Sequence, residues 1–304
     1  MEILKSEYII PQMKKTSPFD LNDCILLLDD GRYFFGKGFG HKGNYLGEIC
    51  FNTSITGYQE ILTDPSYYNQ IITFTFPHIG IVGSNKFDYE SEKIYASACI
   101  INNEITPPSN HRSEISFEKW LIKNKKACIT GIDTRILTKN IRDSGSSNCL
   151  IHFPKGKVAE LNTLKTILEK FPKMEGCDLA TKVSTKKIYS WKNRKKKYLT
   201  QKNIKKKFIA VIDFGIKNNI LNILESIKYD LVVFPCNYPV KEILSMAPKG
   251  IFLSNGPGDP KAIYKKYKSS FDLLKNIEVP IFGICLGHQI LSLMFGALTK
   301  KMHH

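Results

Sequence analysis

A glycine-flanked cysteine near the end of the chain constrains the fold more than any other feature. The apolar run 279–284 ends in Gly-x-Cys-x-Gly, with Gly283 and Gly287 on either side of Cys285, and helix-spaced apolar residues follow at once. The two glycines leave room for a sharp turn from a strand into a helix. Cys285 would then lie at a helix N-terminus, where free N–H groups and the helix dipole stabilise a thiolate. We predict that Cys285 is a nucleophile, although a lone cysteine is more often an inert core residue.

The size and the cysteine usage of the chain limit the class of protein. A length of 304 residues with 42% hydrophobic residues suffices for two domains with real cores. The 8 cysteines contain no C-x-x-C pair, which argues against a zinc site or a disulfide framework and for a reducing compartment. No apolar stretch has the length of a membrane span, and the N-terminus lacks a secretory signal. We therefore expect a cytoplasmic protein that binds neither metal nor membrane.

The net charge of +16 is concentrated in one segment. Residues 182–207 carry 12 Lys and Arg and no acid, and outside this segment the net charge is only +4. A nucleic-acid-binding domain would carry its charge on a structured motif, and none is recognisable here. We interpret the segment as a solvated basic linker, with an electrostatic contact to an acidic partner as the alternative. We expect no nucleic-acid binding.

The pattern of apolar residues divides the chain into four parts. They are an extension, an N-terminal domain, the basic linker and a second domain, at 1–22, 23–185, 186–207 and 208–304. In the N-terminal domain the sequence predicts a hairpin over 24–35, a strand over 70–76, a helix capped by Asp133 and a helix over 158–168. Strands and helices are therefore mixed in this domain.

Short apolar strands alternate with helices from residue 208 onward. The predicted strands lie at 208–212, 231–235, 251–253 and 279–284, and the predicted helices at 216–227, 240–246 and 270–275. Strands that are apolar on both faces indicate an open parallel sheet flanked by helices. The fold class is thus α/β, with a mixed β/α N-terminal domain followed by an open parallel-sheet, helix-flanked domain. Ligands bind at the carboxyl ends of such strands, where Asp213, Gly256 and Cys285 fall.

The loop 254–260 reads Ser-Asn-Gly-Pro-Gly-Asp-Pro. Gly256 and Gly258 allow backbone N–H groups to face a cleft, and together with the N–H of Leu286 they could form an oxyanion hole. A tight crossover loop without a ligand is the alternative. The loop has neither a P-loop nor a dinucleotide-binding pattern.

These motifs together resemble the class I glutamine amidotransferases. The resemblance is carried by Asp213-Phe-Gly-x-Lys-x-Asn-Ile, by the loop 254–260 and by Gly283-Ile-Cys-Leu-Gly-His-Gln. The segments 51–67, 77–80 and 133–138 are similar to the N-terminal domain of one member family, the small subunits of carbamoyl-phosphate synthetase. The resemblance runs from residue 24 to the end of the chain.

The resemblance implies a glutaminase reaction. Cys285 would attack the side-chain amide of glutamine, release ammonia and leave a thioester that water hydrolyses. The residues implied to bind glutamine are Ser66, Gly256, Gly258, Leu286 and Gln289, of which Gly256 and Leu286 would hold the oxyanion. The ammonia would pass to a separate large subunit that uses ATP, Mg and bicarbonate to make carbamoyl phosphate for arginine or pyrimidine synthesis. No cofactor is therefore expected in this chain, and its implied partners are glutamine and the large subunit.

The chain departs from the family pattern at its C-terminal end, so the amidotransferase domain looks incomplete. In the family, this domain continues past the position of His304 and supplies the His and Glu of a catalytic triad. His288 would point away from the thiol, and the terminal His303 and His304 lack a rigid setting. We expect the 304 residues alone to have negligible glutaminase activity.

Several interpretations stay open for such a chain. It is either a piece of the glutaminase subunit or a truncated, inactive chain that only binds the large subunit. Another amidotransferase or an unrelated cysteine hydrolase is disfavoured, because residues 24–180 would have no counterpart there.

Overall fold

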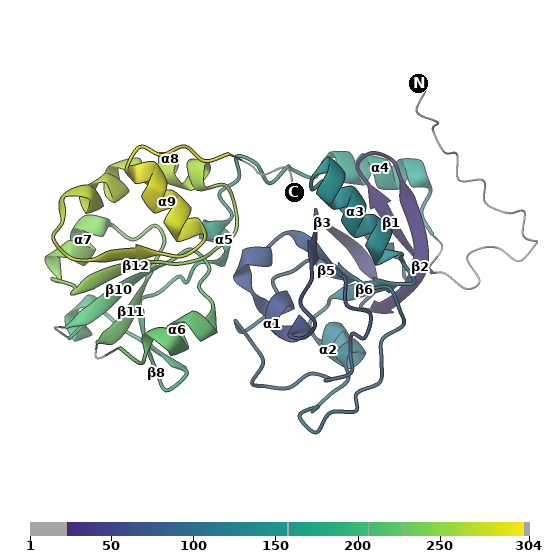
Figure 1. Cartoon of the computed structure of the whole chain (residues 1–304), viewed down its shortest axis with the longest axis horizontal. Coiled ribbons are helices and arrows are strands. Elements are labelled where there is room, and N and C mark those ends of the chain that lie inside the picture. The colour runs from purple at the N-terminus through teal and green to yellow at the C-terminus, as the bar shows by residue number, and fades with distance from the viewer. Residues whose placement is uncertain (1–22, 157, 206, 228, 301–304) are drawn as a thin grey trace, which may run out of the picture.

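The computed structural model describes residues 23–156, 158–205, 207–227 and 229–300, which form two lobes (Figure 1). The predicted extension 1–22 and the terminal His303 and His304 lie outside the described residues. The N-terminal lobe is built on a closed barrel, and the C-terminal lobe on an open sheet. The predicted α/β class, with a mixed domain followed by an open-sheet domain, is therefore confirmed.

Seven strands close the N-terminal barrel in the order β1-β2-β6-β5-β4-β3-β7. Their bounds are β1 (Cys24–Leu28), β2 (Tyr33–Gly40), β3 (Gly43–Asn52), β4 (Gln70–Phe74), β5 (Ala98–Ile100), β6 (Ala127–Thr130) and β7 (Asn148–Phe153). Neighbours from β3 through β4 and β5 to β6 are parallel, and the other pairs are antiparallel. The predicted hairpin is present as β1 and β2, and β4 is the strand predicted at 70–76.

Successive side chains of β1 pack alternately into two hydrophobic cores. Leu26 points into the barrel core, whereas Ile25 packs outward against Leu164. Helices and a short 3-10 turn surround the barrel: α1 (Tyr58–Thr63), η1 (Pro65–Tyr67), α2 (Phe117–Lys123), α3 (Thr134–Ser144) and α4 (Leu161–Glu169). Helix α3 starts where predicted, because the Asp133 carboxylate accepts the N–H of Ile136 at 2.9 Å.

The C-terminal sheet has the strand order β13-β12-β10-β11-β8-β9. The strands are β8 (Tyr189–Lys192), β9 (Lys195–Tyr198), β10 (Phe208–Asp213), β11 (Asp230–Pro235), β12 (Gly250–Leu253) and β13 (Ile281–Gly283). The helical segments are α5 (Ala180–Val183), η2 (Gln201–Asn203), α6 (Asn218–Leu224), α7 (Val240–Ser245), α8 (Pro260–Phe271), η3 (Asp272–Asn276) and α9 (Leu286–Met294). Strands β10 to β13 are parallel, as predicted.

Helices cover both faces of this sheet. Figure 1 shows α7, α8 and α9 on one side and α6 on the other. On the first side Phe208 and Ile212 of β10 pack with Ile290 of α9, and on the second Val211 packs with Leu221 of α6. The carboxyl ends of β10, β12 and β13 therefore meet at one edge of the lobe, next to the barrel.

The segment predicted as a solvated basic linker instead carries a β-hairpin. Strands β8 and β9 pair with each other, and β8 pairs antiparallel with β11, which places Tyr189 opposite Val233 and Trp191 opposite Leu231. Tyr189 and Trp191 are 2% and 5% exposed. The prediction of a linker over 186–207 was wrong because two buried aromatic side chains anchor the lysine-rich hairpin to the sheet.

The helix predicted at 270–275 starts much earlier than expected. Helix α8 begins at Pro260, and the Asp259 carboxylate caps it by accepting the N–H of Lys261 at 2.8 Å. Proline is favoured in the first turn of a helix, where no N–H is needed. The final residues of the predicted helix belong to η3.

Candidate active site

Cys285 lies in a strained turn between β13 and α9. Its backbone has φ 50° and ψ −112°, a conformation that a residue with a side chain rarely adopts, and it is the N-cap residue of α9. The first N–H groups of a helix have no partner within the helix, and that of Leu286 is one of them. The Cys285 side chain is exposed. The predicted turn from a strand into a helix is therefore present, with the exposed Cys285 next to the N–H of Leu286.

The two glycines of the turn are required by close backbone packing. A Cβ atom on Gly283 would lie 2.7 Å from the carbonyl oxygen of Gly287, and one on Gly287 would lie 2.1 Å from that of Leu253. The N–H of Gly287 donates to the Ser254 carbonyl at 3.0 Å. The nucleophile turn is therefore clamped against the end of β12.

The loop after β12 is fixed by the loop after β10. The Ser254 hydroxyl accepts the N–H of Phe214 at 2.9 Å, and a Cβ on Gly256 would lie 2.1 Å from the Phe214 carbonyl oxygen. Gly258 has φ +100°, which favours glycine, and packs against the backbone of Cys177. Neither glycine can be replaced without moving the loop 254–260 or the backbone that it packs against.

The Asp213 carboxylate holds the turn after β10. One oxygen accepts the N–H groups of Gly215 and Ile216, each at 2.8 Å, and the other accepts that of Thr185 at 2.7 Å. Burial raises the pKa of Asp213, and the N–H donors oppose that rise. Its role is thus to shape the strand end, not to react.

A segment of the N-terminal lobe joins these three strand ends. The Asn255 side-chain amide donates to the Ser66 hydroxyl and to the Gly215 carbonyl, both at 2.9 Å, and Asn255 is 2% exposed. A Cβ on Gly215 would lie 3.1 Å from Pro65 and 3.2 Å from Pro257. The structure therefore places the Ser66 hydroxyl against the loop 254–260, although Ser66 lies more than 180 residues from Asn255 along the chain.

Comparison with known proteins agrees with this geometry. Residues 26–151 match the carbamoyl-phosphate synthase small chain, CPSase domain, and residues 210–304 match glutamine amidotransferase class-I. The carbamoyl phosphate synthase small chain of Zymomonas mobilis subsp. mobilis is 42% identical over 91% of this chain and 75% of its own length. That of Buchnera aphidicola subsp. Schizaphis graminum is 47% identical over 92% of this chain and 74% of its own. The chain belongs to the carbamoyl-phosphate synthase small chain family.

The two lobes are held together by an ion pair as well as by the side-chain amide of Asn255. Lys217, the N-cap residue of α6, pairs with the Asp64 carboxylate at 3.1 Å, and Asp64 is 5% exposed. The Glu90 carboxylate accepts the N–H of Asn219 at 2.9 Å. Burial lowers the pKa of Lys217, but Asp64 and Glu90 outweigh this, so the pKa lies above its usual value. For Glu90, an acid, burial has the opposite effect and raises the pKa of the carboxyl group.

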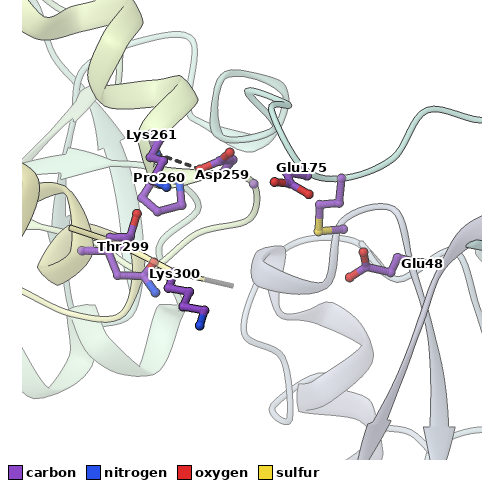
Figure 2. A pocket seen from close by; sticks show the side chains of 10 residues that line it. Glu48, Glu175, Asp259, Pro260, Lys261, Thr299 and Lys300 are labelled. Atoms are coloured by element: carbon purple, nitrogen blue, oxygen red, sulfur yellow. Dashed lines mark hydrogen bonds between the residues drawn. The ribbon is translucent and has the colours of Figure 1, made fainter. Parts of the chain in front are cut away.

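A cavity of about 310 Å³ opens between the lobes (Figure 2). Gly258 and Gln289 line it, whereas Ser66, Gly256, Cys285 and Leu286 are not among its lining residues. Its charged side chains are Glu48, Glu175, Asp259, Lys261 and Lys300. Figure 2 shows Glu48 and Glu175 on one wall and Thr299 and Lys300 on the other. The predicted site is therefore split between this cavity and the exposed turn beside it.

Sequence reasoning missed the residues that dock the lobes. Asn255 and Asp64 lie within the motifs quoted above, but their partners are distant in the chain and no local pattern identifies them.

The described residues contain neither a metal-ligand cluster nor a membrane-spanning helix. No group of three or more His, Cys, Asp or Glu in that part of the chain has a metal-binding arrangement. None of its helices is long and apolar enough to cross a lipid bilayer.

Proposed function

We propose that this chain is the glutamine-hydrolysing subunit of carbamoyl-phosphate synthetase. The observation that carries the proposal is the strained backbone of Cys285, which exposes a thiol at the N-terminus of α9. Membership of the small chain family supports the assignment of glutamine as substrate. A chain that only bound a partner would have no use for such a strained residue, so that alternative is disfavoured.

The reaction follows from the position of the thiol. The Cys285 sulfur attacks the side-chain carbonyl carbon of glutamine, and the N–H groups of Leu286 and Gly256 stabilise the oxyanion. The C–N bond then breaks, and the proton lost by the thiol leaves with the nitrogen as ammonia. Water attacks the resulting thioester, which releases glutamate and restores the thiol. Each step conserves charge and needs no redox cofactor.

Substrate binding would use both lobes. Gly258 and Gln289 line the cavity beside the turn, and we assign them to the glutamine molecule. Ser66 would contact the substrate from the N-terminal lobe, because Asn255 holds its hydroxyl at the strand ends. Glutamine would therefore bind only when the two lobes are docked.

The partner of this reaction is a separate large subunit. We propose that it receives the ammonia and supplies the ATP, Mg and bicarbonate chemistry, and that the N-terminal lobe provides most of the docking surface. The complex would act in the cytoplasm and serve arginine synthesis, pyrimidine synthesis or both.

Replacement of Cys285 by serine tests the proposal. In the intact protein with its large subunit, we expect Cys285→Ser to lower glutamine-dependent carbamoyl phosphate formation by at least ~10³-fold. Ammonia-dependent formation should be unchanged, because it bypasses the thiol. Product formation from each nitrogen source is the measurement.

Cys177→Ser is the matched control. Cys177 is half-buried, its thiol donates to the Lys173 carbonyl, and its contact with Gly258 and Asp259 is made by its backbone carbonyl, which serine keeps. This variant should keep its glutamine-dependent activity. Full glutamine-dependent activity in Cys285→Ser would overturn the proposal.

A further inference from the structure

A second cavity between the lobes lies away from the thiol. It has a volume of about 530 Å³. The N-terminal lobe contributes Glu92, Lys93 and Tyr95, and the C-terminal lobe contributes residues from 182–187 and from the β8–β9 hairpin. Both walls are therefore built from structured segments, and anything bound there would touch both lobes.

Positive charge dominates the lining of this cavity. Its lysines are Lys93, Lys182, Lys186, Lys187 and Lys196, and among the described residues its only carboxylates are Glu92 and Asp213. Glu92 pairs with Lys196 at 2.8 Å. Asp213 is 4% exposed, and its oxygens already accept three backbone N–H groups. Little negative charge is left to balance the remaining lysines.

Three of these lysines are available to a ligand. Within the described residues, neither Lys182 nor Lys187 forms an ion pair, and both are exposed. Lys93 is also exposed and forms no ion pair there, and its ammonium lies 4.8 Å from the ring centre of Tyr95, whereas Lys186 donates to the Thr181 carbonyl at 2.8 Å. A concave surface lined by cations concentrates the field and favours an anion of several charges.

We propose that this cavity is a binding site for a phosphorylated small molecule, which bridges Lys93 of the barrel lobe and Lys182 and Lys187 of the sheet lobe. The exposed ring of Tyr198, which meets Tyr189 edge to face at the cavity wall, offers a stacking surface for a base. A nucleotide would use both the lysines and the ring, whereas pyrophosphate would use the lysines alone.

The site borders the residues that dock the lobes. Gly215 and Pro65, which contact each other beside Asn255, also line this cavity. An anion held by both walls would stabilise the docked arrangement and so raise the temperature of unfolding. This inference does not depend on the identity of the reaction at Cys285.

Calorimetric titration of the full chain with pyrophosphate and with ATP tests the proposal. We expect saturable binding of both ligands and an unfolding temperature that rises with ligand concentration. Binding should weaken as salt is added, because the lysines are partly exposed. If ATP binds more tightly than pyrophosphate, the adenine base contacts Tyr198. If the two affinities are equal, the site recognises the phosphates alone.

The variant Lys182→Gln/Lys187→Gln should bind both ligands at least ~10-fold more weakly, since each lost charge near the ligand is worth about fivefold. The matched control is Lys241→Gln/Lys249→Gln, which removes the same charge from exposed positions outside the cavity. Circular dichroism would confirm that both variants fold. No saturable binding of either ligand, or equal weakening in the control, would overturn the proposal.

Discussion

Backbone strain at Cys285 is the residue-scale feature on which the site depends. A residue with a side chain held at φ 50° and ψ −112° costs on the order of 1–3 kcal/mol. Hydrogen bonds on both flanks maintain it, from Gly287 to Ser254 and from Ile284 to Leu253. The fold therefore gives up some stability in order to expose the thiol.

Cys285→Gly should separate stability from activity. Glycine adopts this conformation without strain, so we expect the free energy of unfolding to rise by about 1 kcal/mol while glutamine hydrolysis is lost. Urea unfolding measures the first effect. Cys285→Ala is the control, because it removes the sulfur but keeps the strain. A glycine variant no more stable than the alanine variant would contradict this account.

His152 makes the barrel sensitive to acid. Its ring lies 2.6 Å from the Asn44 side-chain oxygen, and its other nitrogen accepts the N–H of Ala159 at 3.2 Å, an arrangement that requires the neutral ring. Burial lowers the pKa of His152. The folded state thus binds this proton less readily than the unfolded state, so stability should be full above about pH 6.5 and decline below it.

Urea unfolding between pH 5 and pH 8 checks this expectation, with the ring tautomer assigned from the hydrogen bonds. His152→Gln should lose the part of the decline that belongs to this side chain. A decline of equal size in wild type and variant would show that other groups cause it.

At the scale of elements, the lysine-rich hairpin protects the edge of the C-terminal sheet. Strand β9 is the last in the strand order, and Lys195 and Lys197 are exposed on it. Charged side chains on an edge strand oppose pairing with a second chain. The basic segment therefore has a structural role in addition to any ligand.

Lys195→Val/Lys197→Val should promote self-association through β9. We expect larger species in light scattering at protein concentrations where the wild type stays uniform. Lys202→Val/Lys249→Val removes the same charge from exposed positions off this strand. Equal association in both variants would attribute the effect to net charge instead of the edge.

The elements also show how far the sequence could predict the fold. The turn at Cys285 and the cap at Asp133 were predicted because their signals are local glycines and carboxylates. The pairing of β8 with β11 was not predicted, because the many lysines of this segment made its two buried aromatic residues, Tyr189 and Trp191, look like part of a solvated linker. Strands β1 and β7, which close the barrel, pair residues more than 100 positions apart, and no short sequence motif predicts this pairing.

At the scale of the whole molecule, the ion pair of Lys217 with Asp64 joins the lobes. Asp64 is buried, so removing Lys217 leaves its carboxylate with the N–H of Ser66 at 2.8 Å but without its cationic partner. We expect Lys217→Gln to lower the free energy of unfolding by about 1–3 kcal/mol and to weaken glutamine binding. Calorimetry and the KM for glutamine are the measurements.

Lys37→Gln is the control for this prediction. Lys37 pairs with Glu104 at 2.9 Å, but both side chains are about half exposed or more, and such pairs contribute little. A Lys217 variant that behaves like the Lys37 variant would show that the lobes dock without this ion pair.

The contact of Asn255 with Ser66 has a consequence for synthesis of the protein. Ser66 is translated and folded with the barrel long before the sheet that carries Asn255 leaves the ribosome. While only the barrel has been synthesised, the chain lacks Cys285. Before the two lobes dock, the C-terminal sheet lacks its contact with Ser66. The protein would therefore release ammonia only after the two lobes have docked. Incomplete chains would not hydrolyse glutamine.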